Sequence, residues 1–204
     1  FNYQVYLIMS EQALSIPYGS SDPQLDPALR QAIMAAVDNL FAEQLTFTEE
    51  LVRYPSVRGQ EGNCQDFIHD ALAQRGYAMD RWTIDEKVIS HHPGFSPVSV
   101  SYDQAVNVVG THRPQQQAGR SLILNGHVDV VPVGPLDLWD APPFEPSRDA
   151  TGEWLYGRGA GDMKAGLAAN IYALDALKSL GYQPAAPVYL QSVTEEECTG
   201  NGAL

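Results

Sequence analysis

Residues 121–129 read Ser-Leu-Ile-Leu-Asn-Gly-His-Val-Asp, an apolar run that ends in a polar H-x-D motif. A short run of aliphatic residues predicts a central strand of a sheet. Asp129 follows His127 by two positions, so on an extended strand both side chains project from the same face and can reach one metal centre. The stretch therefore predicts a strand whose end carries a metal-binding pair.

Two further acidic motifs follow at equal distances. Asp162, in Gly-Ala-Gly-Asp-Met-Lys at 159–164, follows Asp129 by 33 residues (162 − 129), and Glu195, in Thr-Glu-Glu-Glu at 194–197, follows Asp162 by 33 more (195 − 162). Each gap is long enough for one loop-and-helix crossover between neighbouring strands of an α/β sheet, which would bring all three motifs to one edge. One imidazole and several carboxylates at that edge suit a divalent cation.

In this order and spacing, the three motifs resemble the M20 group of metallopeptidases and deacylases, which includes acetylornithine deacetylase, succinyl-diaminopimelate desuccinylase, aminoacylase-1 and glutamate carboxypeptidase. The resemblance covers roughly residues 45–204. It implies that His127 binds one zinc ion and that Asp129 orients this histidine. It also implies that Asp162 bridges two zinc ions and that the Asp162–Met163 peptide bond is cis.

Three consecutive glutamates leave two assignments open. We expect Glu195 to be the general base and Glu196 a metal ligand, because relatives place an Asn-Gly or Gln-Gly pair five or six residues after the ligand, and Asn201-Gly202 fits that register. A shift by one residue would make Glu196 the base and Glu197 the ligand. The candidate catalytic residues are therefore Asp129 and Glu195, and the candidate metal ligands are His127, Asp162 and Glu196.

The resemblance implies that a metal-activated water attacks an amide carbonyl while Glu195 accepts its proton and passes it to the leaving amine. The expected substrate is an N-acyl amino acid, as in deacetylases and desuccinylases, or a short peptide. Zinc is the expected cofactor, with cobalt or manganese as alternatives. A dipeptidase or carboxypeptidase of the same family is a second hypothesis. A metal-binding fragment without turnover is a third, although such a module would have no need of a general base.

The fold class that the resemblance implies is α/β, a three-layer zinc-exopeptidase-like catalytic domain with a mixed sheet. Relatives continue with two further metal ligands and an inserted lid and dimerisation domain. We therefore expect residues 26–204 to be the N-terminal part of a zinc hydrolase catalytic domain, inactive alone, and the complete enzyme to be a homodimer. Residues 1–25 are expected to be an irregular leader, vector-derived before Met9 if that methionine is the native start.

Apolar residues recur at helical spacing from Leu29 to Val52, after an Asp26-Pro27 cap, and predict one long helix or two in series, ended by Tyr54-Pro55. The other expected elements, in chain order, are a helix over 61–75, a strand over 77–88, two paired central strands over 107–110 and 121–127, a long loop over 130–157, a helix over 163–180 and a strand over 187–194.

Composition narrows the class of protein further. A chain of 204 residues that is 44% hydrophobic and 18% charged fits a globular domain. Its net charge of −13 argues against nucleic acid or an anionic membrane as a partner. The two cysteines, Cys64 and Cys198, are too few for a disulfide framework, and no stretch approaches the roughly 20 apolar residues that span a bilayer. A cytoplasmic location fits best.

Overall fold

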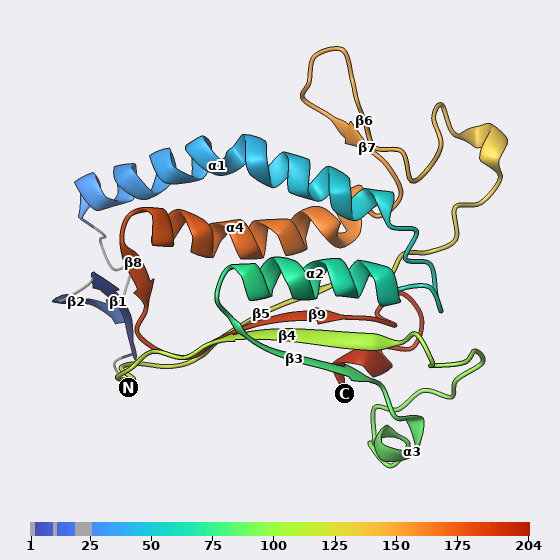
Figure 1. Ribbon diagram of the computed structural model, residues 1–204, viewed down its shortest axis with the longest axis horizontal. Helices are drawn as coiled ribbons and strands as arrows, with labels where there is room; N and C mark the ends of the chain where they lie inside the picture. The colour runs from blue at the N-terminus through green and yellow to red at the C-terminus, as the bar shows by residue number, and fades with distance from the viewer. Residues whose placement is uncertain (1–2, 10–11, 19–25) are drawn as a thin grey trace.

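Three helices lie over one face of a four-stranded sheet in the computed structural model, which describes residues 3–9, 12–18 and 26–204 (Figure 1). The helices are α1 (Pro27–Arg53), α2 (Gly62–Gln74) and α4 (Ala165–Ser179). The strands, in spatial order, are β3 (Ala78–Thr83), β4 (Val106–His112), β9 (Val188–Val193) and β5 (Leu122–His127). β4 is antiparallel to β3 and β9, whereas β5 is parallel to β9, so the predicted mixed α/β sheet is confirmed.

The two central strands that were expected to pair with each other are separated by β9. Val108 of β4 lies opposite Ser192, and His127 of β5 lies opposite Val193. The reason is the crossover: α4 carries the chain back along the sheet, so that β9 enters parallel to β5 and fills the position between β5 and β4. As a result, the end of β5 at His127 lies beside the acidic turn that follows Val193.

The long helix α1 is one continuous helix, capped at its N-terminus and ended before a proline at its C-terminus. Asp26 Oδ1 accepts hydrogen bonds from the N–H groups of Ala28 (2.7 Å) and Leu29 (3.2 Å), and Pro27 occupies the first helical position. The helix ends at Arg53, just before Tyr54-Pro55, where the proline disfavours a helical conformation of the preceding residue. The predicted helices over 61–75 and 163–180 are likewise confirmed as α2 and α4.

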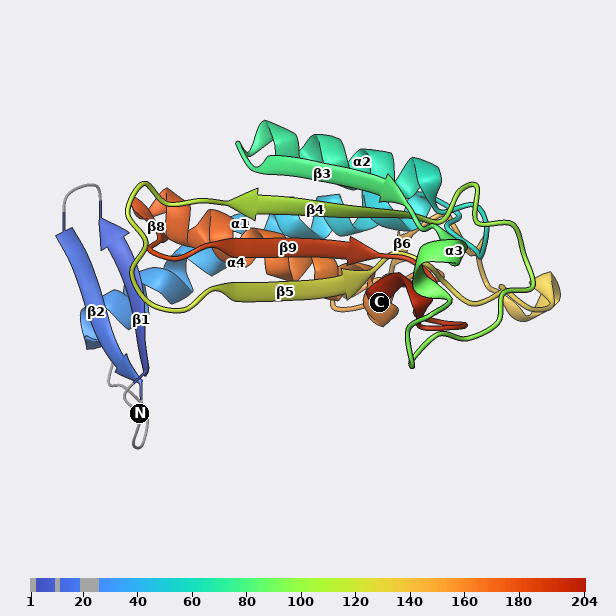
Figure 2. The ribbon, with the colours of Figure 1, turned by 90° about the horizontal axis from the view of Figure 1, so that it is seen from below.

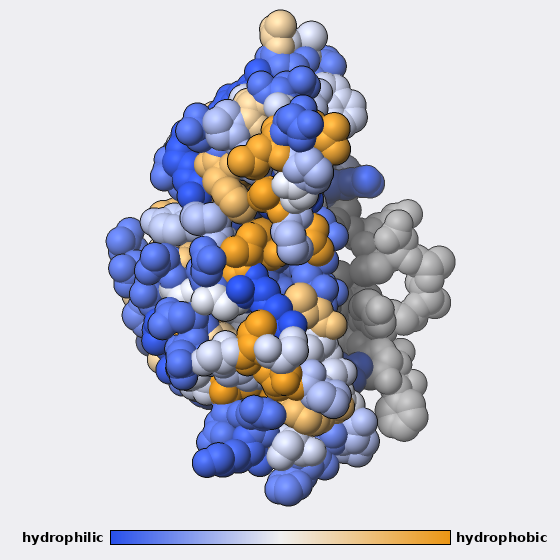
Figure 3. Space-filling model, turned by 90° about the vertical axis from the view of Figure 1, so that its right-hand side faces the viewer, coloured by the Kyte–Doolittle hydropathy of each residue, from blue (hydrophilic) through white to orange (hydrophobic). Residues whose placement is uncertain are grey.

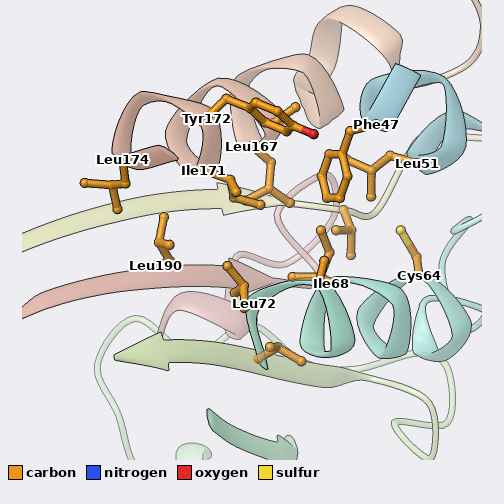
Figure 4. Close-up of a cluster of buried hydrophobic side chains, with 14 of the residues drawn as sticks. Phe47, Leu51, Cys64, Ile68, Leu72, Leu167, Ile171, Tyr172, Leu174 and Leu190 are labelled. Carbon is orange, nitrogen blue, oxygen red and sulfur yellow. The ribbon is translucent and has the colours of Figure 1, made fainter. Parts of the chain in front are cut away.

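The hydrophobic core lies between these helices and the sheet (Figure 4). Leu51 of α1 and Ile68 of α2 are completely buried, and each contributes about 2 kcal/mol by leaving water. At the outer end of the core, the Arg75 guanidinium stacks 5.2 Å from the ring centroid of Tyr172 and pairs with Asp175 at 2.7 Å. The helices and the sheet therefore form one packed frame, from which the loops at the strand ends project.

The opposite face of the sheet carries little cover in the described residues, as the view from below shows (Figure 2). Only the short helix α3 (Glu86–Ile89) and the terminal turn η3 (Asn201–Ala203) lie against it, and they enclose a cavity of about 430 Å³ with residues such as Trp82 and Val109. Of the three layers expected, the described residues form the sheet and one helical layer. No helix among them is long and apolar enough to cross a membrane.

The N-terminal segment differs from the irregular leader that was expected. β1 (Tyr3–Met9) and β2 (Gln12–Tyr18) form an antiparallel hairpin, and β1 also pairs with β8 (Tyr182–Pro184). Aromatic and β-branched residues in Tyr3–Met9 favour a strand. The remainder of the predicted leader, residues 1–2, 10–11 and 19–25, lies outside the described residues.

Two other expectations are only partly met. The strand predicted over 77–88 ends at Thr83, because Asp85 caps α3 by accepting a hydrogen bond from the Lys87 N–H at 2.9 Å. The long loop after β5 contains three short elements, which are the turn η1 (Leu136–Leu138) and the small hairpin of β6 (Ser147–Arg148) and β7 (Leu155–Tyr156).

Candidate metal centre

His127 lies at the carboxyl end of β5, and both of its ring nitrogens face acidic residues. Nδ1 lies 3.0 Å from the backbone oxygen of Asp129 and 3.4 Å from its Oδ1, while Nε2 lies 3.2 Å from Asp162 Oδ1. Burial alone would lower the pKa of His127, but the hydrogen bond and charge of Asp129, with the charge of Glu196, raise it to about 9. The carboxylates of Asp162 and Glu196 near Nε2 create a negative electrostatic potential there, which attracts a cation.

Asp162 is carried by the turn η2 (Ala160–Lys164), which leads into α4. The turn starts at Gly159, whose φ of 76° and closeness to the Val130 side chain leave no room for a Cβ. Lys164 anchors its far end, since this buried ammonium donates to the backbone oxygen of Tyr54 at 2.8 Å. The Asp162–Met163 peptide bond is cis, as the resemblance implied.

The turn after β9 brings two glutamates to the same place. The Glu197 N–H donates to Asp129 Oδ2 at 3.0 Å, and Glu196 Oε2 lies 3.5 Å from His127 Nε2. One ligand atom each from His127, Asp162 and Glu197 lie within 4.8 Å of one another. The carboxyl ends of β5 and β9 thus gather an imidazole and several carboxylates at one edge, where ligand sites of α/β sheets commonly lie.

Glu195 has a different environment. Its carboxylate accepts hydrogen bonds from Arg58 Nε at 2.7 Å, from Arg58 Nη2 at 2.8 Å and from the Tyr102 hydroxyl at 2.7 Å, and only 1% of the residue is exposed. Burial alone would raise the pKa of Glu195, but hydrogen bonds from Arg58, Tyr102 and Thr199 hold it below its usual value. Of the predicted site residues, the structure brings together His127, Asp129, Asp162 and Glu196, and Glu197 lies with them. The Glu195 carboxylate lies outside this group and binds Arg58.

The donor set around His127 fits a divalent metal ion. A neutral imidazole nitrogen and carboxylate oxygens are ligands of zinc, cobalt and manganese. Burial, followed by the charge of Asp162, raises the pKa of Glu197, whose carboxylate lies in the group around His127. Carboxylates at such close quarters repel one another, and a bound cation would remove this repulsion.

A cavity of about 560 Å³ adjoins the turn that carries Asp162, and residues of the 130–157 loop line it, among them Trp139 and Tyr156. Trp139 also fixes the loop, because its Nε1 donates to the Val133 oxygen at 2.8 Å and Arg158 stacks 5.1 Å from its ring centroid. Figure 3 looks onto this end of the molecule, where hydrophobic residues form a broken band across a largely hydrophilic face. Exposed Leu136 and Leu138 belong to the same loop.

Sequence reasoning did not find Arg58 or Tyr102. Arg58 lies between α1 and α2, and Tyr102 lies in the connection before β4, so neither belongs to an acidic motif. Arg58 and Glu195 are 137 positions apart, and no local pattern joins them.

The segment of the chain that carries the three acidic motifs is similar to a known protein family. Residues 123–204, which include all three acidic motifs, match the model of peptidase family M20/M25/M40. The resemblance to the M20 family that these motifs indicated is thereby confirmed over residues 123–204.

The curated relatives with similar sequences include two bacterial succinyl-diaminopimelate desuccinylases. That of Acidovorax ebreus (strain TPSY) is 34% identical and that of Delftia acidovorans (strain DSM 14801 / SPH-1) is 35% identical, each over 154 residues that make up 75% of this chain. The matched region is 36% of each relative, so the chain spans about a third of their length.

Solved structures share the fold at lower identity. The dipeptidase Dug1p from Saccharomyces cerevisiae matches with a TM-score of 0.65 and 22% identity over 82% of this chain and 35% of its own. Human carnosine dipeptidase 1 matches with a TM-score of 0.62 and 20% identity over the same shares. These likenesses support the fold, including its mixed sheet.

Proposed function

We propose that the chain is part of a metal-dependent hydrolase that cleaves the amide bond of an N-acyl amino acid, of the desuccinylase or deacetylase type. One observation carries the proposal: ligand atoms of His127, Asp162 and Glu197 converge within 4.8 Å at the carboxyl ends of β5 and β9. The relatives at 34% and 35% identity are desuccinylases, which favours an N-acyl substrate over a dipeptide. Zinc is the first choice of metal, with cobalt and manganese as alternatives.

The geometry favours the second of the two glutamate registers, in which Glu197 is a metal ligand and Glu196 is the general base. The Glu197 backbone is fixed by Asp129, and its carboxylate belongs to the group around His127. Glu196 lies 3.5 Å from His127 Nε2, and 57% of its side chain is exposed, so a water molecule can reach it. The Glu195 carboxylate is free neither to bind a metal nor to accept a proton from water, because Arg58 and its other partners occupy its oxygens.

The metal, when bound, would polarise the substrate carbonyl and lower the pKa of the attacking water. His127, Asp162 and Glu197 would hold it. Asp129 keeps Nδ1 of His127 engaged, so that the lone pair of Nε2 faces Asp162, which is a common arrangement for metal-binding histidines. Glu196 would take the proton of the attacking water and pass it to the leaving amine nitrogen.

Three properties of the complete enzyme belong to the same proposal. We expect a homodimer, a small N-acyl amino acid or short peptide as substrate, and a cytoplasmic location. The absence of a disulfide between Cys64 and Cys198, which are both free, is consistent with that location.

The test uses the complete enzyme that contains this chain, loaded with zinc and assayed on N-succinyl amino acids, N-acetyl amino acids and dipeptides. Glu196→Gln is expected to retain the metal and to lose turnover by about 10²-fold to 10⁴-fold. Glu197→Gln is expected to lose metal affinity. Glu86→Gln, which changes an exposed glutamate on α3, is the matched control and should leave both unchanged.

Full turnover in Glu196→Gln would refute the assignment of the base. Hydrolysis of dipeptides alone would move the proposal to the dipeptidase alternative. No hydrolysis of any of the three substrate classes by the metal-loaded enzyme would refute the proposed function.

A further inference from the structure

Glu195 has an unusual backbone conformation directly before the two glutamates of the site. Its φ is 65°, in the left-handed region that residues other than glycine adopt only when the surrounding structure holds them there. Its backbone oxygen accepts hydrogen bonds from the N–H groups of Thr199 at 3.1 Å and Gly200 at 2.7 Å, so the chain folds around it. The backbone at Glu195 therefore sets the direction in which the next two residues leave β9.

The Glu195 side chain supplies contacts that can hold this conformation. Both oxygens of the carboxylate bind the Arg58 guanidinium, in the two-pronged geometry that fixes orientation as well as distance. Tyr102 and Thr199 donate their hydroxyl groups to Oε2 at 2.7 and 2.8 Å. With four hydrogen bonds, the carboxylate has little remaining capacity to bind a metal or a water molecule.

The same network ties the far end of the turn. Asn201 Nδ2 donates to the Tyr102 hydroxyl at 2.9 Å, and Asn201 Oδ1 accepts from the Ser96 N–H at 3.0 Å. On the other side of the turn, the Glu197 N–H donates to Asp129. The turn is thus anchored to three distant segments of the chain. One flank carries the hydrogen bonds of Glu195 and Asn201, and the other flank, which Asp129 holds, faces His127.

We infer that Glu195 is a positioning residue, whose ion pair with Arg58 holds the 194–200 turn in the form that presents Glu196 and Glu197 to His127. The inference rests on the proposed function, because it concerns the residues that would bind the metal and the water. It gives Glu195 a role distinct from that of a base: the carboxylate acts through the backbone that it fixes.

A purely structural ion pair and a positioning ion pair predict different results when the protein stays folded. If the pair only adds stability, a folded variant binds metal in the usual geometry. If the pair positions the turn, metal affinity and metal geometry change even where folding does not. The visible absorption spectrum of bound Co²⁺ reports coordination geometry and separates the two cases.

The experiment is a Co²⁺ titration of the complete protein against a competing chelator, at a temperature where circular dichroism shows each variant to be folded. Glu195→Gln is expected to weaken Co²⁺ binding at least tenfold and to alter the visible spectrum. Arg58→Lys, which keeps the charge but not the two-pronged geometry, is expected to produce a smaller change in the same direction. Arg81→Gln removes an ion pair with Asp66 at the surface and should match the unmodified protein.

Unchanged affinity and spectrum in folded Glu195→Gln would overturn the inference. If Glu195→Gln does not fold, Arg58→Lys is the test. A Co²⁺ affinity and spectrum of Arg58→Lys identical to those of the unmodified protein would then overturn the inference. A different result identifies failure of the proposed function: the unmodified protein binds no Co²⁺, or Glu197→Gln binds it as well as the unmodified protein does.

Discussion

The two flanks of the 194–200 turn use glutamate in opposite ways. On one flank, Glu195 is buried and its carboxylate is saturated by Arg58, Tyr102 and Thr199. On the other flank, Glu196 and Glu197 face an imidazole and further carboxylates, with oxygens that the protein itself does not saturate. Three identical residues in a row therefore have two kinds of environment.

The difference shows how to separate structural from functional charge. A buried carboxylate whose hydrogen bonds are complete is costly to deprive of a partner, and it has no capacity left for chemistry. A group of carboxylates without enough positive charge is unfavourable until a cation binds, and such groups mark functional sites. The following predictions test whether the two flanks really divide in this way.

Arg58→Gln should produce the largest effect on stability. It leaves the charge of Glu195 buried without its main partner, and breaking such a pair costs about 3 kcal/mol of unfolding free energy. Urea denaturation measures the loss. Arg81→Gln, on the exposed pair with Asp66, is the control and should cost less than about 1 kcal/mol. Equal losses in the two variants would show that the Arg58 flank is not a stabilising one.

The carboxyl group of Glu61 interacts with charges on both flanks, those of Asp129 and Glu195, and should make the stability of the protein depend on pH. It is completely buried, its Oε2 has no hydrogen-bond partner, and burial raises its pKa from 4.5 to about 7, with smaller contributions from the charges of Asp129 and Glu195. The folded protein therefore binds this proton more tightly than the unfolded chain. The resulting stabilisation is complete below pH 4.5 and is lost as the pH rises through about 7.

Glu61→Gln removes this dependence. Between pH 5 and pH 8, the unmodified protein should lose up to about 3 kcal/mol of unfolding free energy relative to the variant. Denaturant titrations of both proteins at the two pH values measure the difference. Parallel pH profiles would show that Glu61 is not a strained carboxylate.

Asp129→Asn should weaken metal binding by about tenfold to a hundredfold, because residues that orient a metal-binding histidine have effects of that order. Asp129 Oδ1 lies 3.4 Å from His127 Nδ1, and its Oδ2 holds the Glu197 N–H. Competition with a chelator measures the affinity. Asp137→Asn, on the exposed turn η1, is the control, and a loss no greater than in that variant would contradict the orienting role.

Asp162→Asn should have the smallest effect on stability. The Asp162 side chain is 79% exposed, and without metal its repulsion with the neighbouring carboxylates is offset by its ion pair with His127 at 3.2 Å, so the unfolding free energy should change by no more than about 0.5 kcal/mol. With metal added, the same variant should become less stable than the unmodified protein, because it binds the ion less tightly. Equal stability of the variant and the unmodified protein in the presence of metal would contradict a metal-binding role of Asp162.

Much of this arrangement could be predicted from the sequence because local patterns carry it. The Asp26-Pro27 cap fixed the start of α1, and the three motifs with their 33-residue gaps indicated one site at one edge of the sheet. His127 and Asp162 lie together as expected, since each follows from the end of a strand or a crossover.

The parts that could not be predicted depend on contacts between distant residues. The Asn201-Gly202 pair favours the register with Glu195 as base, yet Asn201 binds Ser96 and Tyr102, so its position is set by the neighbouring loop. The left-handed backbone at Glu195 leaves no local signature in three identical residues. The placement of β9 between β4 and β5 likewise depends on how the whole sheet assembles.

The most direct test of the central claim is a crystal structure of the complete protein with zinc, with the metal located by anomalous scattering at the zinc edge. We predict that His127, Asp162 and Glu197 bind the metal, that Glu196 lies beside it, and that Glu195 remains paired with Arg58. A structure in which Glu195 approaches the metal, or in which zinc binds away from His127, would contradict the account.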